Sequence, residues 1–195
     1  MVAAILAAAI PTAVYSVLIW WLDRYEKEPL WLIAVAFVWG SLPAIGISIV
    51  FETHSVTEDN ERGVVTGWEP GRLSDHGRVQ ARQLGKRRSD DGVVAVYSSD
   101  LTRAVETATL AFGGMGIPLH VDRRLRECHF GARTGSIRAD IVKTRSKYID
   151  EPYPGGESWR GAVERVGHFL ADMRAWPKGS RLLVVGHLAT WISFE

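Results

Sequence analysis

Two histidines follow apolar segments whose length and composition predict buried β-strands. His54 comes after residues 47–52, and His187 comes after residues 181–186. Ligands of a parallel sheet bind beyond the carboxyl ends of its strands, so we expect both imidazoles at that edge. An imidazole in such a place can act as a nucleophile or hold an anion.

Two further residues add charge and acidity to this set. Arg103 falls in the first turn of the helix expected after the strand at residues 93–97, where helix amides also favour an anion. Glu127 lies in a loop with arginines on its N-terminal side. Phosphoryl transfer needs a nucleophile, positive charge for the phosphate oxygens and an acid for the leaving group. The four residues together indicate that chemistry.

The segments around these residues alternate between helix and strand. Residues 93–97 and 181–186 are short apolar runs typical of buried strands. Helices are expected over 74–88, from a cap at Ser98 or Ser99 to Leu110, and over 158–176. This alternation predicts a three-layer α/β sandwich with a mostly parallel sheet covered on both faces.

Seven blocks along residues 51–195, taken in order, resemble the histidine phosphatase (phosphoglycerate mutase-like) superfamily. They are Thr53-His54-Ser55 with Asn60, Thr66-Gly67-Trp68, Leu73-Ser74-x-x-Gly77-x-x-Gln80-Ala81, Tyr97-Ser98-Ser99-Asp100-Leu101-x-Arg103-Ala104 with Thr107, Leu125-Arg126-Glu127 with Gly131, Gly156-Glu157-Ser158 and Val184-Val185-Gly186-His187.

The resemblance implies a phosphoric monoester hydrolase that works through a phosphohistidine. His54 would be the nucleophile and Glu127 the acid, while Arg103 and His187 would hold the phosphoryl oxygens. Asn60 would contact phosphate, and we also expect Thr53, Thr66 and Gly67 at the substrate. No metal or other cofactor is implied, and the partner would be a phosphorylated small molecule or a phosphoprotein.

A phosphatase is expected rather than a mutase, because the superfamily's mutases have a longer segment between the acid and the second histidine. Here sixty positions separate Glu127 from His187.

Two features depart from the superfamily's pattern. Thr53 and Ser55 stand where its usual block has Arg and Gly, and one lost donor to the phosphate oxygens is worth about 3 kcal/mol in comparable sites. Arg62 or Arg126 could replace the missing arginine. The chain ends at Glu195, so the domain is expected to lack the superfamily's C-terminal part. The alternatives are an inactive phosphate-binding domain and a non-functional membrane-protein fragment or fusion.

The composition of the first fifty residues differs from that of the rest. The 195-residue chain has a mean hydropathy of +0.01, but residues 1–50 contain five of its 45 charged side chains. Uncharged stretches at about 2–22 and 29–51 are long enough to cross a bilayer, so we expect a two-helix transmembrane hairpin before the domain at 51–195. A pair of buried core helices is the alternative. The strand at 47–52 and a full second span cannot both form.

The hairpin segment also resembles part of a known membrane-protein family and predicts where the protein is located. Residues 1–52 resemble the opening of PrsW-type intramembrane proteases, through Trp21-Leu22-Asp23-Arg24-Tyr25-Glu26-Lys27-Glu28-Pro29-Leu30 and Ala36-Phe37-Val38-Trp39-Gly40, but lack that family's later catalytic spans. We expect attachment to a membrane through residues 1–51, with the phosphatase-like domain in an aqueous compartment. The net charge of +1 gives no reason to expect nucleic acid.

Overall fold

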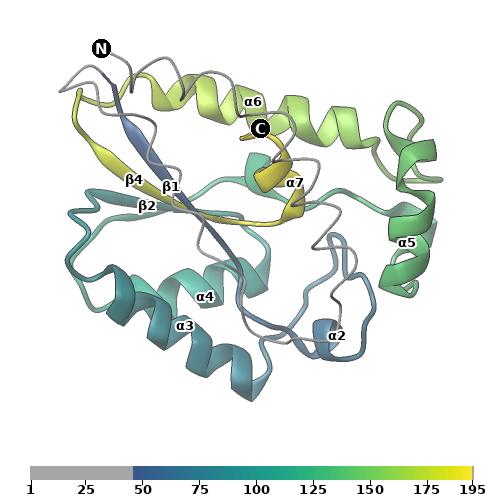
Figure 1. The fold of residues 1–195 in the computed structure, drawn as a ribbon, viewed down its shortest axis with the longest axis horizontal. Helices are drawn as coiled ribbons and strands as arrows, with labels where there is room; N and C mark the ends of the chain where they lie inside the picture. The colour runs from purple at the N-terminus through teal and green to yellow at the C-terminus, as the bar shows by residue number, and fades with distance from the viewer. Residues whose placement is uncertain (1–45, 195) are drawn as a thin grey trace, which may run out of the picture. The chain divides into compact units, whose positions relative to one another are not determined.

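The computed structural model describes residues 46–194, and at the centre of this part lies a four-stranded sheet with all neighbours parallel. The strand order is β1-β4-β2-β3. The bounds are Ser48–Thr53 for β1, Ala95–Ser98 for β2, Leu119–Val121 for β3 and Arg181–Gly186 for β4. All four carboxyl ends therefore point to one edge of the sheet, where α2 and α7 lie in Figure 1.

Helices cover both faces of this sheet, as the sequence predicts. In Figure 1, α3 and α4 lie on one side of the strands and α6 on the other. Alternate residues of β4 explain the arrangement: Leu183 and Val185 pack in the cluster with α3 and α4, whereas Leu182 and Val184 pack with α6. The bounds are Asp75–Arg88 for α3, Thr102–Phe112 for α4 and Trp159–Met173 for α6.

Serine side chains cap two of these helices, and the cap predicted for the third lies elsewhere. The hydroxyl of Ser74 accepts the N–H of Gly77, and that of Ser158 accepts the N–H of Gly161, both at 3.1 Å. The cap predicted at Ser98 or Ser99 is wrong, because α4 begins three residues later, at Thr102. Ser98 is the last residue of β2, and the hydroxyl of Ser99 instead accepts the N–H of Leu101.

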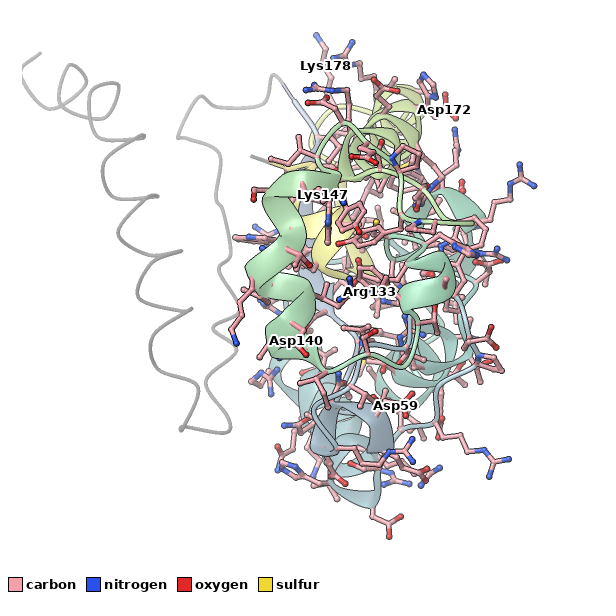
Figure 2. The ribbon with its side chains drawn as sticks, turned by 90° about the vertical axis from the view of Figure 1, so that its right-hand side faces the viewer. Asp59, Arg133, Asp140, Lys147, Asp172 and Lys178 are labelled. Carbon is pink, nitrogen blue, oxygen red and sulfur yellow. The ribbon has the colours of Figure 1, made fainter. Side chains whose placement is uncertain are left out.

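Smaller elements complete the edge at the carboxyl ends of the strands. Figure 2 turns this edge toward the viewer and shows Asp59, Arg133 and Asp140 on it. A third apolar cluster includes Phe130, Tyr153 and Trp159 and supports the segment that follows Glu127. The bounds are Glu58–Glu61 for α2, Arg138–Thr144 for α5 and Leu188–Ile192 for α7, with 3-10 turns at Arg123–Leu125, Gly131–Arg133 and Arg145–Tyr148.

The expected second membrane span, residues 29–51, needs a correction at its end. Residues 48–51 belong to β1, which pairs with β4 from Ser48↔Arg181 to Thr53↔Gly186. The strand therefore forms, and the last residues of the expected span do not continue as a helix. The backbone N–H and C=O groups of these residues are paired with β4 instead. The span at 2–22 and residues 29–45 lie outside the described part. Within residues 46–194, no helix is long and apolar enough to cross a membrane.

Candidate active site

Strand register brings the two histidines together. Thr53 of β1 pairs with Gly186 of β4, and the N–H of His54 donates to the Gly186 carbonyl at 3.0 Å. His54 and His187 are the next residues of the two strands, so their rings meet with centroids 5.0 Å apart. Positions 54 and 187, far apart in the chain, therefore meet through the parallel pairing that the apolar runs predict.

The imidazole of His54 is held in one tautomer. Its Nδ1 lies 2.8 Å from the carbonyl oxygen of Ser55, which can only accept, so Nδ1 carries the hydrogen in this contact. Nε2 then keeps its lone pair. Burial, together with the positive charge of Arg103, lowers the pKa of His54 to about 3, against an opposing effect of the Ser55 hydrogen bond. His54 is therefore neutral at physiological pH.

Arg103 is buried beside the histidines, with only 2% of its surface exposed. Its Nη2 donates to the carbonyl of Gly67 at 2.8 Å and its Nη1 to that of Glu69 at 3.2 Å. Burial lowers the pKa of Arg103, and the nearby carboxyl groups of Glu127 and Asp59 offset part of this effect. The guanidinium is thus fixed in place and supplies positive charge to a buried site.

His187 is fixed by the same guanidinium. Its Nδ1 lies 3.5 Å from Nη2 of Arg103, which can only donate, so Nδ1 acts as the acceptor and Nε2 carries the hydrogen. Burial and the charge of Arg103 hold the pKa of His187 well below its usual value. Among residues 46–194, Nε2 is one of the buried side-chain atoms without a hydrogen-bond partner. An unsatisfied buried N–H of this kind is suited to a phosphoryl oxygen.

Glu127 completes the group through the backbone that follows His187. Its Oε1 accepts the N–H groups of Cys128 and Ala189 at 2.9 and 3.1 Å, and its Oε2 accepts that of Leu188 at 3.3 Å. Because Leu188 and Ala189 directly follow His187, these bonds tie the carboxyl group to the second histidine. The structure therefore brings all four expected catalytic residues into one site.

Of the four residues expected to contact the substrate, two adjoin the catalytic group and two form hydrogen bonds to other residues. Thr53 ends β1 directly before His54, and Gly67 touches the site through its carbonyl bond to Arg103. Asn60 and Thr57 bond to each other's backbone N–H in a capping box at α2. The hydroxyl of Thr66 donates to Asp59 at 2.8 Å. Asn60 and Thr66 thus make these hydrogen bonds within residues 57–66.

The two arginines named as replacements for the missing one are engaged elsewhere. Arg62 is exposed and forms an ion pair with Asp59. Arg126 binds both carboxylate oxygens of Asp100, at 2.7 and 2.6 Å. Arg103 is therefore the cation that the structure joins to the histidines.

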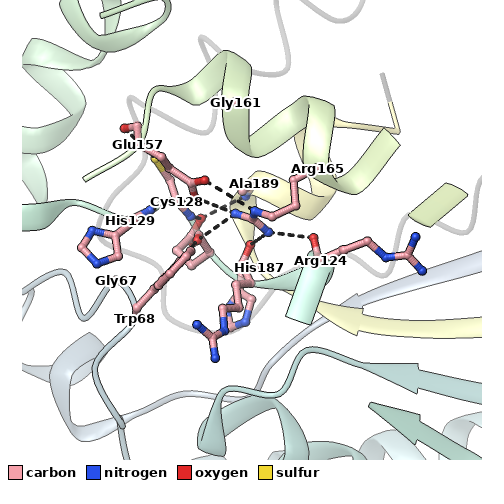
Figure 3. A network of polar contacts seen from close by, with 12 residues as sticks. Gly67, Trp68, Arg124, Cys128, His129, Glu157, Gly161, Arg165, His187 and Ala189 are labelled. Atoms are coloured by element: carbon pink, nitrogen blue, oxygen red, sulfur yellow. Dashed lines mark hydrogen bonds and ion pairs between the residues drawn. The ribbon is translucent and has the colours of Figure 1, made fainter. Parts of the chain in front are cut away.

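Sequence reasoning missed Arg165 of α6. Its guanidinium donates to the carbonyls of Arg124 and Arg126 at 2.7 and 3.1 Å and to the carboxylate of Glu157 at 2.6 Å (Figure 3). It thereby holds the backbone on which Glu127 stands. Helical periodicity gives no signal for such a residue. An arginine next to the buried Val166 is predicted only to lie at the boundary between the apolar and the polar face of the helix.

The described part of the chain, residues 46–194, contains no group of three or more His, Cys, Asp or Glu side chains arranged to hold a metal ion. The thiol of Cys128, next to Glu127, is buried, and desolvation raises its pKa far above the usual value.

Comparisons with known proteins show the family of the chain. The model of the histidine phosphatase superfamily (branch 1) matches residues 49–192. A protein of Salmonella paratyphi B named "Probable phosphoglycerate mutase GpmB" is 30% identical over 149 residues, which cover 72% of this chain and 69% of that protein.

Solved structures show the same similarity. The structure of YhfR from Bacillus stearothermophilus matches with a TM-score of 0.67 and 27% identity, covering 76% of this chain and 77% of the other. The alpha-ribazole phosphatase from Shigella flexneri matches with a TM-score of 0.63 and 25% identity, covering 71% and 73%. The fold is thus the phosphoglycerate mutase-like α/β fold with a parallel sheet.

Proposed function

The chain belongs to the histidine phosphatase superfamily (branch 1), and on that premise we propose that it hydrolyses phosphomonoesters through a phosphohistidine on His54. The observation that carries this proposal is the hydrogen bond from Nδ1 of His54 to the Ser55 carbonyl. It leaves the Nε2 lone pair of a neutral imidazole as the nucleophile, next to Arg103 and His187.

In the first proposed step, Nε2 of His54 attacks phosphorus and the bond to the ester oxygen breaks. The guanidinium of Arg103 and the Nε2–H of His187 bind the phosphoryl oxygens, whose charge grows in the transition state. Glu127 donates a proton to the departing oxygen from its carboxyl group, and the alcohol leaves. The product of this step is phosphohistidine with an ionised Glu127.

In the second proposed step, Glu127 takes a proton from a water molecule, whose oxygen attacks the phosphohistidine. The bond between Nε2 and phosphorus breaks, inorganic phosphate leaves, and His54 returns to its neutral form. Glu127 regains its proton and is ready for the next ester. Each group thus ends the cycle as it began.

The spacing of the proposed site residues favours a phosphatase over a mutase. Sixty positions separate Glu127 from His187, whereas the superfamily's mutases have a longer segment between the acid and the second histidine.

We further propose that the substrate is a phosphorylated small molecule. A relative of similar fold is named as an alpha-ribazole phosphatase, which is consistent with a small phosphorylated substrate. Attachment to a membrane through the segment before β1 is part of the proposal, and it is supported by composition alone. All five charged side chains of that segment lie within residues 23–28, which leaves uncharged stretches on both sides.

Turnover of p-nitrophenyl phosphate by the purified protein tests the proposal. We expect hydrolysis by the wild type and its loss in His54→Ala, while His168→Ala, an exposed histidine of α6, retains it. The substitution of Thr53 for arginine supports a second candidate, a domain that binds phosphate without turnover. Binding of vanadate with no hydrolysis would favour that candidate.

A further inference from the structure

Residues 66–69 form a tight turn next to the site, here named the 66–69 turn. The N–H of Glu69 donates to the carbonyl of Thr66 at 3.1 Å and closes it. Gly67 has φ +54°, and a Cβ there would lie 3.3 Å from side-chain atoms of Phe130 and Thr134. The turn therefore requires glycine for both its conformation and its packing.

One side of the 66–69 turn holds the phosphate-binding arginine. The carbonyls of Gly67 and Glu69 accept from the two terminal nitrogens of Arg103. The orientation of this guanidinium therefore depends on the path of the turn.

The other side of the turn holds the acid. The indole N–H of Trp68 donates to the main-chain carbonyl of Glu127 at 2.6 Å. The Trp68 ring contacts Arg126, whose guanidinium carbon is 4.6 Å from the ring centroid, and the edge-on ring of His129, whose centroid is 4.5 Å away. Arg126 is in turn fixed by Asp100. Figure 3 shows Trp68 with the Arg165 network; the guanidinium carbon of Arg165 lies 5.8 Å from the centroid of the Trp68 ring.

Glu127 is therefore held at both of its ends. Backbone N–H groups of Cys128 and Ala189 bind its carboxyl group, and Trp68 binds its carbonyl. Arg165 also reaches that carbonyl, at a longer 3.3 Å. Removing the indole N–H would thus leave the carbonyl with a partner, and the main effect would fall on the position of Glu127 rather than on stability.

We propose that Trp68 is a positioning residue, which sets the Glu127 carboxyl group relative to the Arg103 guanidinium through the single turn that binds both. The inference rests on the proposed function, because it assigns Trp68 to the step in which Glu127 protonates the leaving oxygen. Displacement of a reacting group by about 1 Å can cost on the order of a hundredfold in rate.

A comparison of two esters with different leaving groups distinguishes a positioning role of Trp68 from a merely structural one. An alkyl phosphate releases a strongly basic alkoxide and depends on the acid, whereas p-nitrophenyl phosphate releases a stable phenolate without a proton. The value of kcat/KM reports steps up to the first irreversible one, which here is transfer to His54. A misplaced acid therefore lowers kcat/KM for the alkyl ester and spares the aryl ester.

The experiment compares kcat/KM for both esters in the wild type, Trp68→Phe and Trp176→Phe. We expect Trp68→Phe to lose about tenfold with the alkyl phosphate and less than twofold with p-nitrophenyl phosphate. Trp176→Phe is the matched control, because Trp176 is another half-buried tryptophan whose N–H donates to a side chain, Tyr97 at 3.0 Å. It should behave as the wild type with both esters.

Equal losses for the two esters, or no loss for either, would overturn the role of Trp68 and leave the proposed function intact. Absence of wild-type turnover with both esters would instead overturn the proposed function and the inference with it. If Trp68→Phe fails to fold, benzothienylalanine at position 68 replaces the N–H by sulfur and keeps the ring. The same ester-dependent loss is expected there, and its absence would contradict the proposal.

Discussion

At the scale of single residues, the neutral state of the two site histidines explains both reactivity and a cost in stability. His54 and His187 are desolvated next to Arg103, so neither accepts a proton in the folded protein as readily as in the unfolded chain. A neutral nucleophile is available at physiological pH without assistance from a base. The same arrangement favours the unfolded chain when the solution is acidic.

The pH dependence of stability follows from this shift. Between about pH 4 and pH 6, unfolded His54 binds a proton and folded His54, with a pKa of about 3, does not. The unfolded state thus binds more protons, and the free energy of unfolding rises with pH by up to about 1.4 kcal/mol per pH unit for this group. Urea unfolding should show this slope reduced in His54→Gln and unchanged in His168→Gln. Equal slopes in His54→Gln and the wild type would contradict the assigned pKa.

Thr53 offers a test of the missing positive charge. The residue ends β1 beside Gly186, one position before His54, where the superfamily's usual block has arginine. Thr53→Arg should add a charged donor for the phosphate oxygens, and we expect the inhibition constant of inorganic phosphate to fall about tenfold. Thr53→Gln supplies length without charge and should leave it within twofold. Equal effects of both variants would argue against an electrostatic cause.

At the scale of the elements, close contacts between helices fix the layers that carry the site. A Cβ on Gly85 of α3 would lie 2.1 Å from the carbonyl oxygen of Ala111 at the end of α4. The two helices can approach this closely only with glycine at that position. Since α4 carries Arg103 in its first turn, its placement matters for the site.

Two glycine substitutions test this contact. Gly85→Ala should lower the free energy of unfolding by about 1–3 kcal/mol, because the methyl group forces α3 and α4 apart. Gly167→Ala in α6 meets nothing within 4 Å and should raise it by about 0.5–1 kcal/mol through helix propensity. Chemical denaturation measures both values. A neutral Gly85→Ala would show that α3 and α4 are not packed as described.

Elements with strong periodicity were predictable, and those defined by tertiary contacts were not. The runs at 181–186 and 74–88 carry their own signals, so β4 and α3 lie where the sequence places them. β3 has only three residues, with partly or fully exposed side chains, and therefore no apolar pattern. The role of Arg165 arises from carbonyls forty residues away in the chain. Helical position alone could not reveal it.

At the scale of the whole molecule, the apolar first fifty residues overlap the start of the domain, because its first strand begins at Ser48. The residue proposed as nucleophile follows this strand directly. The expected membrane segment must therefore end before Gly46, whose carbonyl accepts the N–H of Gly179. This leaves residues 29–45 for a second span, close to the shortest length that crosses a bilayer.

Membrane attachment can be measured on the full chain. We expect the protein to remain in the membrane pellet after alkaline carbonate extraction and to enter the supernatant with detergent. Alkaline carbonate releases proteins held at the membrane surface by charge, whereas helices that span the bilayer stay in it. Release by carbonate alone would contradict the transmembrane hairpin. It would leave the assignment of the site untouched, since that rests on residues 46–194.

The most direct test of the central claim is the identification of the phosphorylated residue during turnover. The full chain is mixed with a phosphomonoester, quenched within milliseconds under alkaline conditions, which preserve phosphohistidine, and digested for mass spectrometry. We expect acid-labile and base-stable phosphate on the peptide that contains His54, and none in His54→Gln. Phosphate on His187 or on a hydroxyl side chain, or turnover with no phosphorylated protein, would contradict it.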